Sequence, residues 1–109
     1  MKQYTIDHII YKVGANADEN WKLLSASKPH HLFFHLSSFP SCYVILECNE
    51  SIPEVDIIKA VAEQCKKHTK YKNIPNIKVD YTLCENVIKG DKIGQVYFKS
   101  NKKVKQVKI

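Results

Sequence analysis

The stretch from His31 to Cys48 constrains the fold of this chain more than any other. It places three phenylalanines, two histidines, two cysteines and a tyrosine within eighteen positions. Two apolar segments of strand length, His31–Leu36 and Cys42–Cys48, are joined by a turn over residues 37–41. We therefore predict two adjacent strands whose side chains mostly fill a sheet core. The apolar side chains assigned to this core are Phe33, Phe34, Val44 and Leu46.

The remaining segments supply further strands and two helices. Extended segments are expected over Tyr4–Val13, Ile77–Thr82 and Glu85–Lys89. A closing hairpin is expected from Gly94–Lys99 and Lys103–Lys108, turned by residues 100–102.

The first helix is expected from Asp18 to Ala26, with Trp21 and Leu24 facing inward. The second begins at Pro53 and carries an inward stripe at helical spacing. The stripe consists of Ile57 or Ile58, Val61, Ala62, Cys65 and Thr69. We therefore predict one two-layer α+β domain over residues 1–109, with a mainly antiparallel sheet and two helices packed on one face.

Composition indicates a folded intracellular protein. The chain has 109 residues, of which 44% are apolar and 26% charged, typical of a globular domain. No apolar run reaches the roughly 20 residues of a membrane span. The N-terminal MKQYTIDHIIYKV does not resemble a signal peptide. We expect no membrane association and a location in the cytoplasm.

The four cysteines lie at Cys42, Cys48, Cys65 and Cys84, and none forms a C-x-x-C pair. Structural zinc sites show closely spaced ligand pairs, and disulfide frameworks belong to oxidising compartments. We therefore expect free thiols, with no metal and no cofactor.

Charge is distributed unevenly along the chain. Residues 1–65 carry five lysines against eight acidic residues, a net charge of −3. Residues 66–109 carry twelve lysines against three acidic residues, a net charge of +9. All seventeen basic residues are lysine, which argues against a protein that reads guanines in the DNA major groove. A basic half of this kind favours a polyanionic partner, nucleic acid first and anionic lipid second.

Several short motifs occur in an order typical of a known family. They begin with Val13-Gly14-x-Asn16 and Glu19-Asn20, then Leu32-Phe33-Phe34-His35 and Val44-Ile45-Leu46. After the second helix come Thr69-Lys70-x-Lys72, Val79-Asp80-Tyr81-Thr82, Val87-Ile88-Lys89 and Gly94-x-Val96-x-Phe98. This pattern resembles the NFACT-R domain, the RNA-binding module of NFACT proteins, which also occurs as a stand-alone unit.

The resemblance implies nucleic-acid binding without catalysis. In long NFACT proteins this domain is part of factors that act in ribosome-associated quality control, on large ribosomal subunits obstructed by peptidyl-tRNA. A stand-alone relative is linked to DNA. The expected partner is structured RNA, tRNA or rRNA, and DNA is possible. Three family positions are replaced: an arginine by Ala15, an aspartate by Trp21 and a histidine by Tyr43.

The candidate nucleic-acid-binding residues fall into three groups. Asn16, Asn20, His35 and Tyr43 match family positions. Asn16 could instead cap the helix, His35 could be structural, and Tyr43 could belong to the core. A second group lies at the C-terminal end of the second helix, where four lysines enclose one aromatic residue: Lys66, Lys67, Lys70, Tyr71 and Lys72. Lys12 and Lys89 are secondary candidates. The lysines at positions 102, 103, 105 and 108 could equally protect an edge strand.

Two other functions compete with nucleic-acid binding. A protein-interaction module with a decayed RNA site is suggested by Ala15. A hydrolase or ribonuclease would use His35 with His31 or Cys42 as partner, although the sequence shows no residue that would orient such a pair. We expect no catalytic residues.

Overall fold

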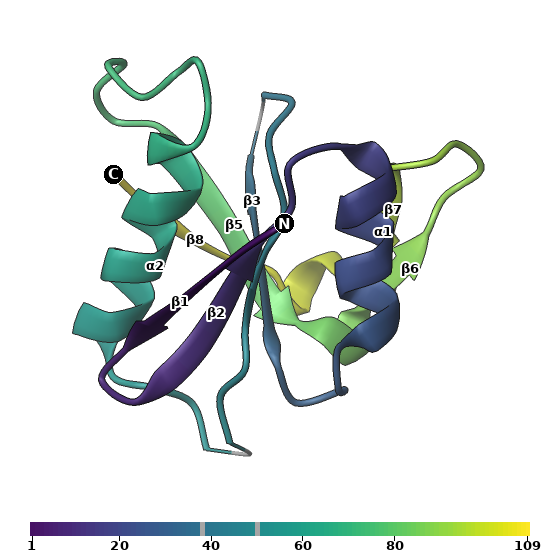
Figure 1. Ribbon diagram of the computed structural model, residues 1–109, viewed down its shortest axis with the longest axis horizontal. Helices are drawn as coiled ribbons and strands as arrows, with labels where there is room; N and C mark the ends of the chain where they lie inside the picture. The colour runs from purple at the N-terminus through teal and green to yellow at the C-terminus, as the bar shows by residue number, and fades with distance from the viewer. Residues whose placement is uncertain (38, 50) are drawn as a thin grey trace.

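The computed structural model describes residues 1–37, 39–49 and 51–109. The elements occur in the order β1 (Lys2–Ile6), β2 (Ile9–Val13), α1 (Ala17–Ala26), β3 (Leu32–Leu36), β4 (Val44–Leu46), α2 (Val55–Lys67), β5 (Lys78–Leu83), β6 (Val87–Lys89), β7 (Val96–Phe98) and β8 (Lys105–Lys108) (Figure 1). Two short 3-10 helices, η1 (Cys84–Asn86) and η2 (Asn101–Lys103), precede β6 and β8.

The strands form two antiparallel units. The larger sheet has six strands in the order β1-β2-β4-β3-β5-β8, and β6 pairs only with β7. Every described pairing is antiparallel. The α+β class with a mainly antiparallel sheet, predicted from the sequence, is confirmed.

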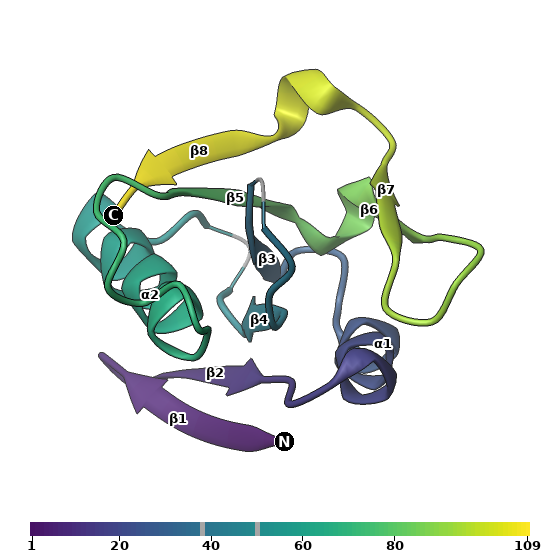
Figure 2. The ribbon, with the colours of Figure 1, turned by 90° about the horizontal axis from the view of Figure 1, so that it is seen from above.

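The helices lie on opposite faces of the sheet, so the expectation that both pack on one face is wrong. Figure 2 shows α2 on one side of β3 and β4, and α1 with β6 and β7 on the other. Phe34 and Val44 belong to the core under α2, whereas Phe33 and Ile45 belong to the core under α1. Successive side chains of a strand point to opposite faces. Because β3 and β4 carry adjacent apolar residues that point to opposite faces, both sides of these strands require cover.

The second helix forms where the apolar period predicts it. It begins at Val55, two residues after Pro53, and its inner face buries Ile58, Val61, Ala62 and Cys65. Thr69 lies beyond the end of the helix at Lys67. In the first helix, Leu23 is the buried apolar residue, and Trp21 and Leu24 are half-buried.

Two strand predictions are wrong. The segment 4–13 is not one extended piece but the β1–β2 hairpin, which turns at Asp7 and His8 with φ of 47° and 65°. Residues 94–108 do not form a hairpin, because β7 pairs with β6 and β8 pairs with β5. Of the predicted turn over residues 37–41, Ser38 lies outside the described residues. No helix in the described part of the chain is long and apolar enough to cross a membrane.

Candidate functional site

A groove of about 650 Å³ opens where α1 begins, β3 ends and α2 ends. We name it the upper groove. Its lining brings together Asn16, Asn20 and His35 from the predicted set. Further polar side chains in the lining are Lys2, Ser41, Cys42 and His68. Among the residues that the structure describes, no Asp or Glu side chain lines this groove.

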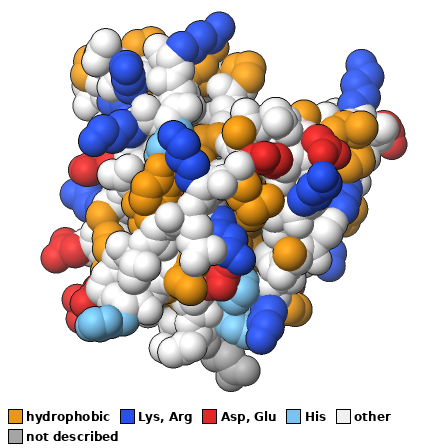
Figure 3. All heavy atoms as spheres, viewed as in Figure 1, with side chains coloured by type: hydrophobic (Ala, Val, Ile, Leu, Met, Phe, Trp, Pro, Cys, Tyr) orange, Lys and Arg blue, Asp and Glu red, His pale blue; other side chains and the backbone are white. Residues whose placement is uncertain are grey.

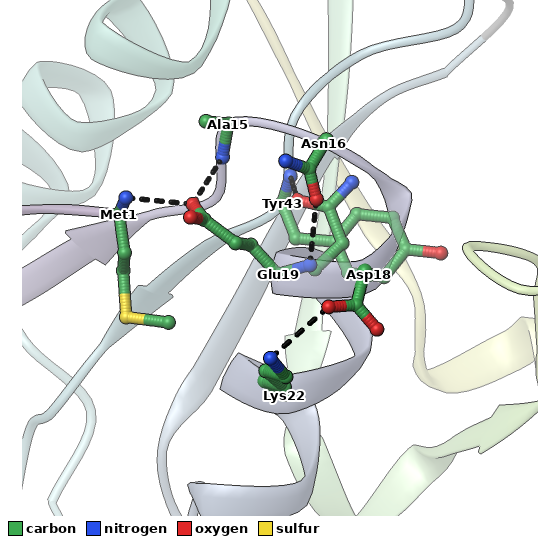
Figure 4. Close-up of polar contacts among 8 residues, drawn as sticks. Met1, Ala15, Asn16, Asp18, Glu19, Lys22 and Tyr43 are labelled. Atoms are coloured by element: carbon green, nitrogen blue, oxygen red, sulfur yellow. Dashed lines mark hydrogen bonds and ion pairs between the residues drawn. The ribbon is translucent and has the colours of Figure 1, made fainter.

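Asn16 caps the first helix at one wall of the groove. Its Oδ1 accepts a hydrogen bond of 2.9 Å from the Glu19 backbone N–H. Glu19 reaches back and accepts from the Ala15 N–H at 3.0 Å, and its carboxylate also lies 2.7 Å from the Met1 ammonium (Figure 4). Reciprocal bonds of this kind satisfy N–H groups that a helix leaves unpaired at its start. The capping role of Asn16 is therefore confirmed.

Asn20 and Tyr43 are buried and make structural contacts. The buried Asn20 side chain accepts from the Tyr43 N–H at 3.1 Å, and the Gly14 N–H donates to the Tyr43 carbonyl at 3.1 Å. Any Cβ at Gly14 would overlap Asn20 Oδ1. The Tyr43 hydroxyl donates to the Gly94 carbonyl, and the side chain is only 1% exposed. Burial raises the pKa of Tyr43 to about 12.

His35 is the predicted residue whose ring faces the groove. The ring is half-buried, stacked 6.3 Å from Phe33 and edge-on at 5.5 Å from Tyr43. Burial lowers the pKa of His35, an effect that the carboxylate of Asp80 on the neighbouring strand partly offsets. The imidazole is therefore neutral near pH 7 and can offer a hydrogen bond but no charge.

Lysines at the end of α2 and in the loop after it are sequence neighbours of one lining residue of the groove. Lys67, Lys70 and Lys72 are exposed, and His68 between them lines the groove. In Figure 3 lysine side chains gather over the upper end of α2 and the loop that follows it. Burial lowers the pKa of His68, and the positive charges of Lys2 and Lys67 lower it further. Positive charge therefore concentrates at this end of the molecule.

Two members of this lysine-rich segment have structural contacts of their own. The Lys66 ammonium donates to the main-chain oxygen of Ile109 at 3.1 Å, which fixes it against the end of β8. Tyr71 is half-buried, with its ring 4.5 Å from that of Phe39 and the Lys70 ammonium 5.4 Å from its centre. Tyr71 therefore supports the loop and offers little free ring surface.

The structure does not bring Lys12 and Lys89 to the groove. The Lys12 ammonium lies 2.8 Å from the Glu47 carboxylate on the sheet. Lys89 donates to the Ser25 hydroxyl on α1, and its ammonium lies 5.4 Å from the centre of the Trp21 ring. The Trp21 indole N–H in turn donates to the Gln95 carbonyl at 3.0 Å. Lys89 thus fastens β6 to α1.

Among the described residues, no hydrogen bond joins His35 to either residue considered as its partner in a hydrolase. His31 accepts from the Lys28 N–H at 3.2 Å through Nδ1, a local structural contact. The Cys42 thiol lies 3.7 Å from the Cys65 carbonyl. The cysteines are all free. Within the described ranges, no three His, Cys, Asp or Glu side chains are placed to hold a metal ion.

Lys2 and His68 are lining residues that the sequence did not single out. Lys2 reaches the groove because the chain turns back at Asp7, which returns β1 alongside β2. His68 lies between Lys67 and Lys70 in the chain, and this position was the one sequence signal that could have marked it as a groove residue. Ring contact at 5.8 Å between Tyr4 and His68 joins the hairpin to the end of α2.

The chain is similar to known proteins both in sequence and in structure. No family model matches the chain. It is 31% identical over 109 residues to coiled-coil domain-containing protein 25 of the zebrafish Danio rerio, an alignment that covers 94% of this chain and 52% of that protein. The chain thus spans about half the length of this relative.

The second similarity is structural. The fold matches the C-terminal part of the fibronectin/fibrinogen-binding protein from Streptococcus suis with a TM-score of 0.87 and 23% identity. The match covers 98% of this chain and 43% of the streptococcal chain. A structural match at 23% identity shows a common fold and does not show a common activity.

Proposed function

We propose that this chain is an NFACT-R-type domain that binds structured RNA, such as tRNA or rRNA, in the cytoplasm and catalyses no reaction. The observation that carries the proposal is that exposed Lys67, Lys70 and Lys72 flank His68 in the chain, and that His68 lines a groove whose described lining contains no carboxylate. The motif order given above supports the same function.

The lysines and the upper groove would make different contacts with the RNA. Exposed lysines neutralise phosphates and supply affinity without base specificity. The groove offers an uncharged hydrogen-bonding group, the His35 imidazole. Such a group suits the 2′-hydroxyls and base edges through which proteins recognise folded RNA. The Ala15 backbone lies at the same wall, where the related domains carry arginine.

The test is a titration of fluorescently labelled tRNA with wild-type protein and with the Lys67→Glu, Lys70→Glu, Lys72→Glu triple variant. We expect the triple variant to lower RNA affinity by at least about tenfold. We also expect the slope of log affinity against log salt to fall by about 1 for each lysine that contacts a phosphate. A matched control carries the same charge reversal at Lys99, Lys102 and Lys105, and circular dichroism checks that each variant folds.

Two outcomes would refute this assignment. Equal losses in the triple variant and its control would mean that net charge alone attracts RNA. Absence of tRNA binding even at low salt would favour the competing function, a protein-interaction module in which Ala15 marks a decayed RNA site.

A further inference from the structure

A second groove, of about 690 Å³, lies at the opposite end of β3 from the upper groove. We name it the lower groove. Leu32, where β3 begins, lines it together with Leu83, where β5 ends. The upper groove instead meets β3 near its end, at His35. The two grooves are therefore separate surfaces, and the inference below does not rest on RNA binding at the first.

The lower groove has a cationic rim. Four exposed lysines line it, and Glu85 is the one acidic side chain among its described lining residues. The lysines are Lys99, Lys102, Lys103 and Lys105. They come from η2 and the residues on either side of it, the helical turn between β7 and β8 in Figure 2. A surface of this kind attracts negatively charged partners.

Two buried polar side chains hold the backbone that carries these lysines. Asn86, 4% exposed, donates from Nδ2 to the Ser100 carbonyl at 2.9 Å, and its Oδ1 accepts from the Ser100 N–H at 2.9 Å. Asn86 also donates to the Thr82 hydroxyl at 3.1 Å, and that hydroxyl donates to the Lys103 carbonyl at 3.1 Å. The lysine-bearing segment is thus fixed to the end of β5 before any partner arrives, which lowers the entropic cost of binding.

The floor of the lower groove is apolar. Leu32, Leu83 and the half-buried Tyr81 contribute to it, and Ile52 stands at its edge with 56% of its surface exposed. Tyr81 is the one aromatic side chain in the described lining, and its ring stacks on Phe34 at 5.7 Å. Phosphodiester groups gain nothing from an apolar floor, whereas an apolar side chain of a peptide does.

We propose that the lower groove binds an acidic peptide segment of a protein partner. An apolar side chain of the segment lies on the floor beside Leu83 and Ile52. Flanking Asp and Glu side chains lie against Lys99, Lys102 and Lys105. The charge complementarity sets the orientation and speeds association, and burial of the apolar side chain supplies much of the affinity.

The test uses fluorescence polarisation with a labelled peptide of sequence Asp-Glu-Leu-Phe-Glu-Asp. A control peptide, Asp-Glu-Ser-Ser-Glu-Asp, has the same charge and no apolar anchor. We expect the control peptide to bind at least about tenfold more weakly. The Lys99→Glu, Lys102→Glu, Lys105→Glu variant should lose at least about tenfold in affinity for the first peptide. Ile52→Ser, an exposed change, should weaken the same binding with the lysines intact.

The matched control is the Lys67→Glu, Lys70→Glu, Lys72→Glu variant, which should leave peptide affinity within about twofold of wild type. Equal binding of both peptides, or equal losses in both triple variants, would reduce the interaction to unspecific charge and overturn the proposal. Undetectable peptide binding would overturn it as well. If the Lys99→Glu, Lys102→Glu, Lys105→Glu variant loses tRNA binding but keeps peptide binding, the lower groove is a nucleic-acid site and the proposal is overturned.

Discussion

His35 combines a place in the upper groove with a partly desolvated ring. Phe33 and Tyr43 cover two sides of the imidazole, and the described carboxylate that acts on it is Asp80. Asp80 itself accepts a hydrogen bond of 2.8 Å from Gln106. Because desolvation outweighs the attraction of Asp80, the folded protein binds a proton at His35 less readily than the unfolded chain does.

This environment sets the sign of a pH effect. The unfolded state carries more protons at this site, so the free energy of unfolding falls as pH drops below the ordinary histidine pKa of 6.5. We expect His35→Gln to flatten the decline of the melting temperature between about pH 7.5 and 5.5. Some decline should remain, because burial also lowers the pKa of His31 and His68. Parallel curves for wild type and variant would contradict the assignment.

The β1–β2 hairpin is an element whose turn departs from the commonest sequence. A two-residue turn of type I′ requires positive φ at both positions, for which Asn-Gly is the preferred pair. Asp7 and His8 adopt φ of 47° and 65° instead. Asp and His enter this region more readily than most residues, yet less readily than glycine. The hairpin therefore contains a local strain that its pairing to β4 offsets.

Replacing this turn tests the strain directly. We expect Asp7→Asn combined with His8→Gly to raise the free energy of unfolding by about 1 kcal/mol. The gain comes from His8→Gly, because a Cβ in the left-handed region costs roughly that much. Thermal denaturation should show the melting temperature rising by several degrees. His8→Ala keeps a Cβ at the strained position and serves as the control. A double variant no more stable than His8→Ala would refute the explanation.

Local signals account for the elements that were predicted well. The stripe of Ile58, Val61 and Cys65 repeats at helical spacing, and α2 forms there. The pairing of β8 had no such signal. It depends on β5 and on Asn86, which holds the Ser100 backbone from fourteen residues away. Contacts of that kind arise in the folded molecule and leave no periodic trace in the chain.

The site was predictable to a similar extent. Asn16 caps a helix for reasons visible locally, and His35, a candidate from the motif, lines the upper groove, which the sequence did not predict. The core alternative for Tyr43 is confirmed, but the partner of its hydroxyl could not be foreseen, because the Gly94 carbonyl lies 51 residues later in the chain. The same holds for the position of α1. A continuous apolar strand indicates two covered faces, but not which helix covers each.

At the scale of the whole molecule, one sheet separates two cores. Leu23 anchors the core under α1, and Ile58 anchors the core under α2; each is 4% exposed. Phe33 and Phe34, adjacent in β3, belong to one core each. Neither core can lose its packing without exposing one face of the same strands. The two should therefore unfold together.

Matched truncations of the two anchors test this cooperativity. We expect Leu23→Ala and Ile58→Ala each to lower the free energy of unfolding by about 2–5 kcal/mol. Each variant should still unfold in a single transition. In calorimetry, the measured enthalpy should equal the van't Hoff enthalpy for both variants. A second transition in either one would show that the face carrying the truncated residue unfolds independently.

The contact of Trp21 with the β6–β7 segment gives the chain a built-in optical reporter. It is the one tryptophan in the sequence, its indole bonds to the Gln95 carbonyl, and Gly94 next to Gln95 lines the upper groove. The emission of an indole responds to the polarity of its surroundings and to the loss of such a bond. A ligand that displaces residues 94 and 95 on entering the groove should therefore change the intrinsic fluorescence, so occupancy can be followed without attaching a dye.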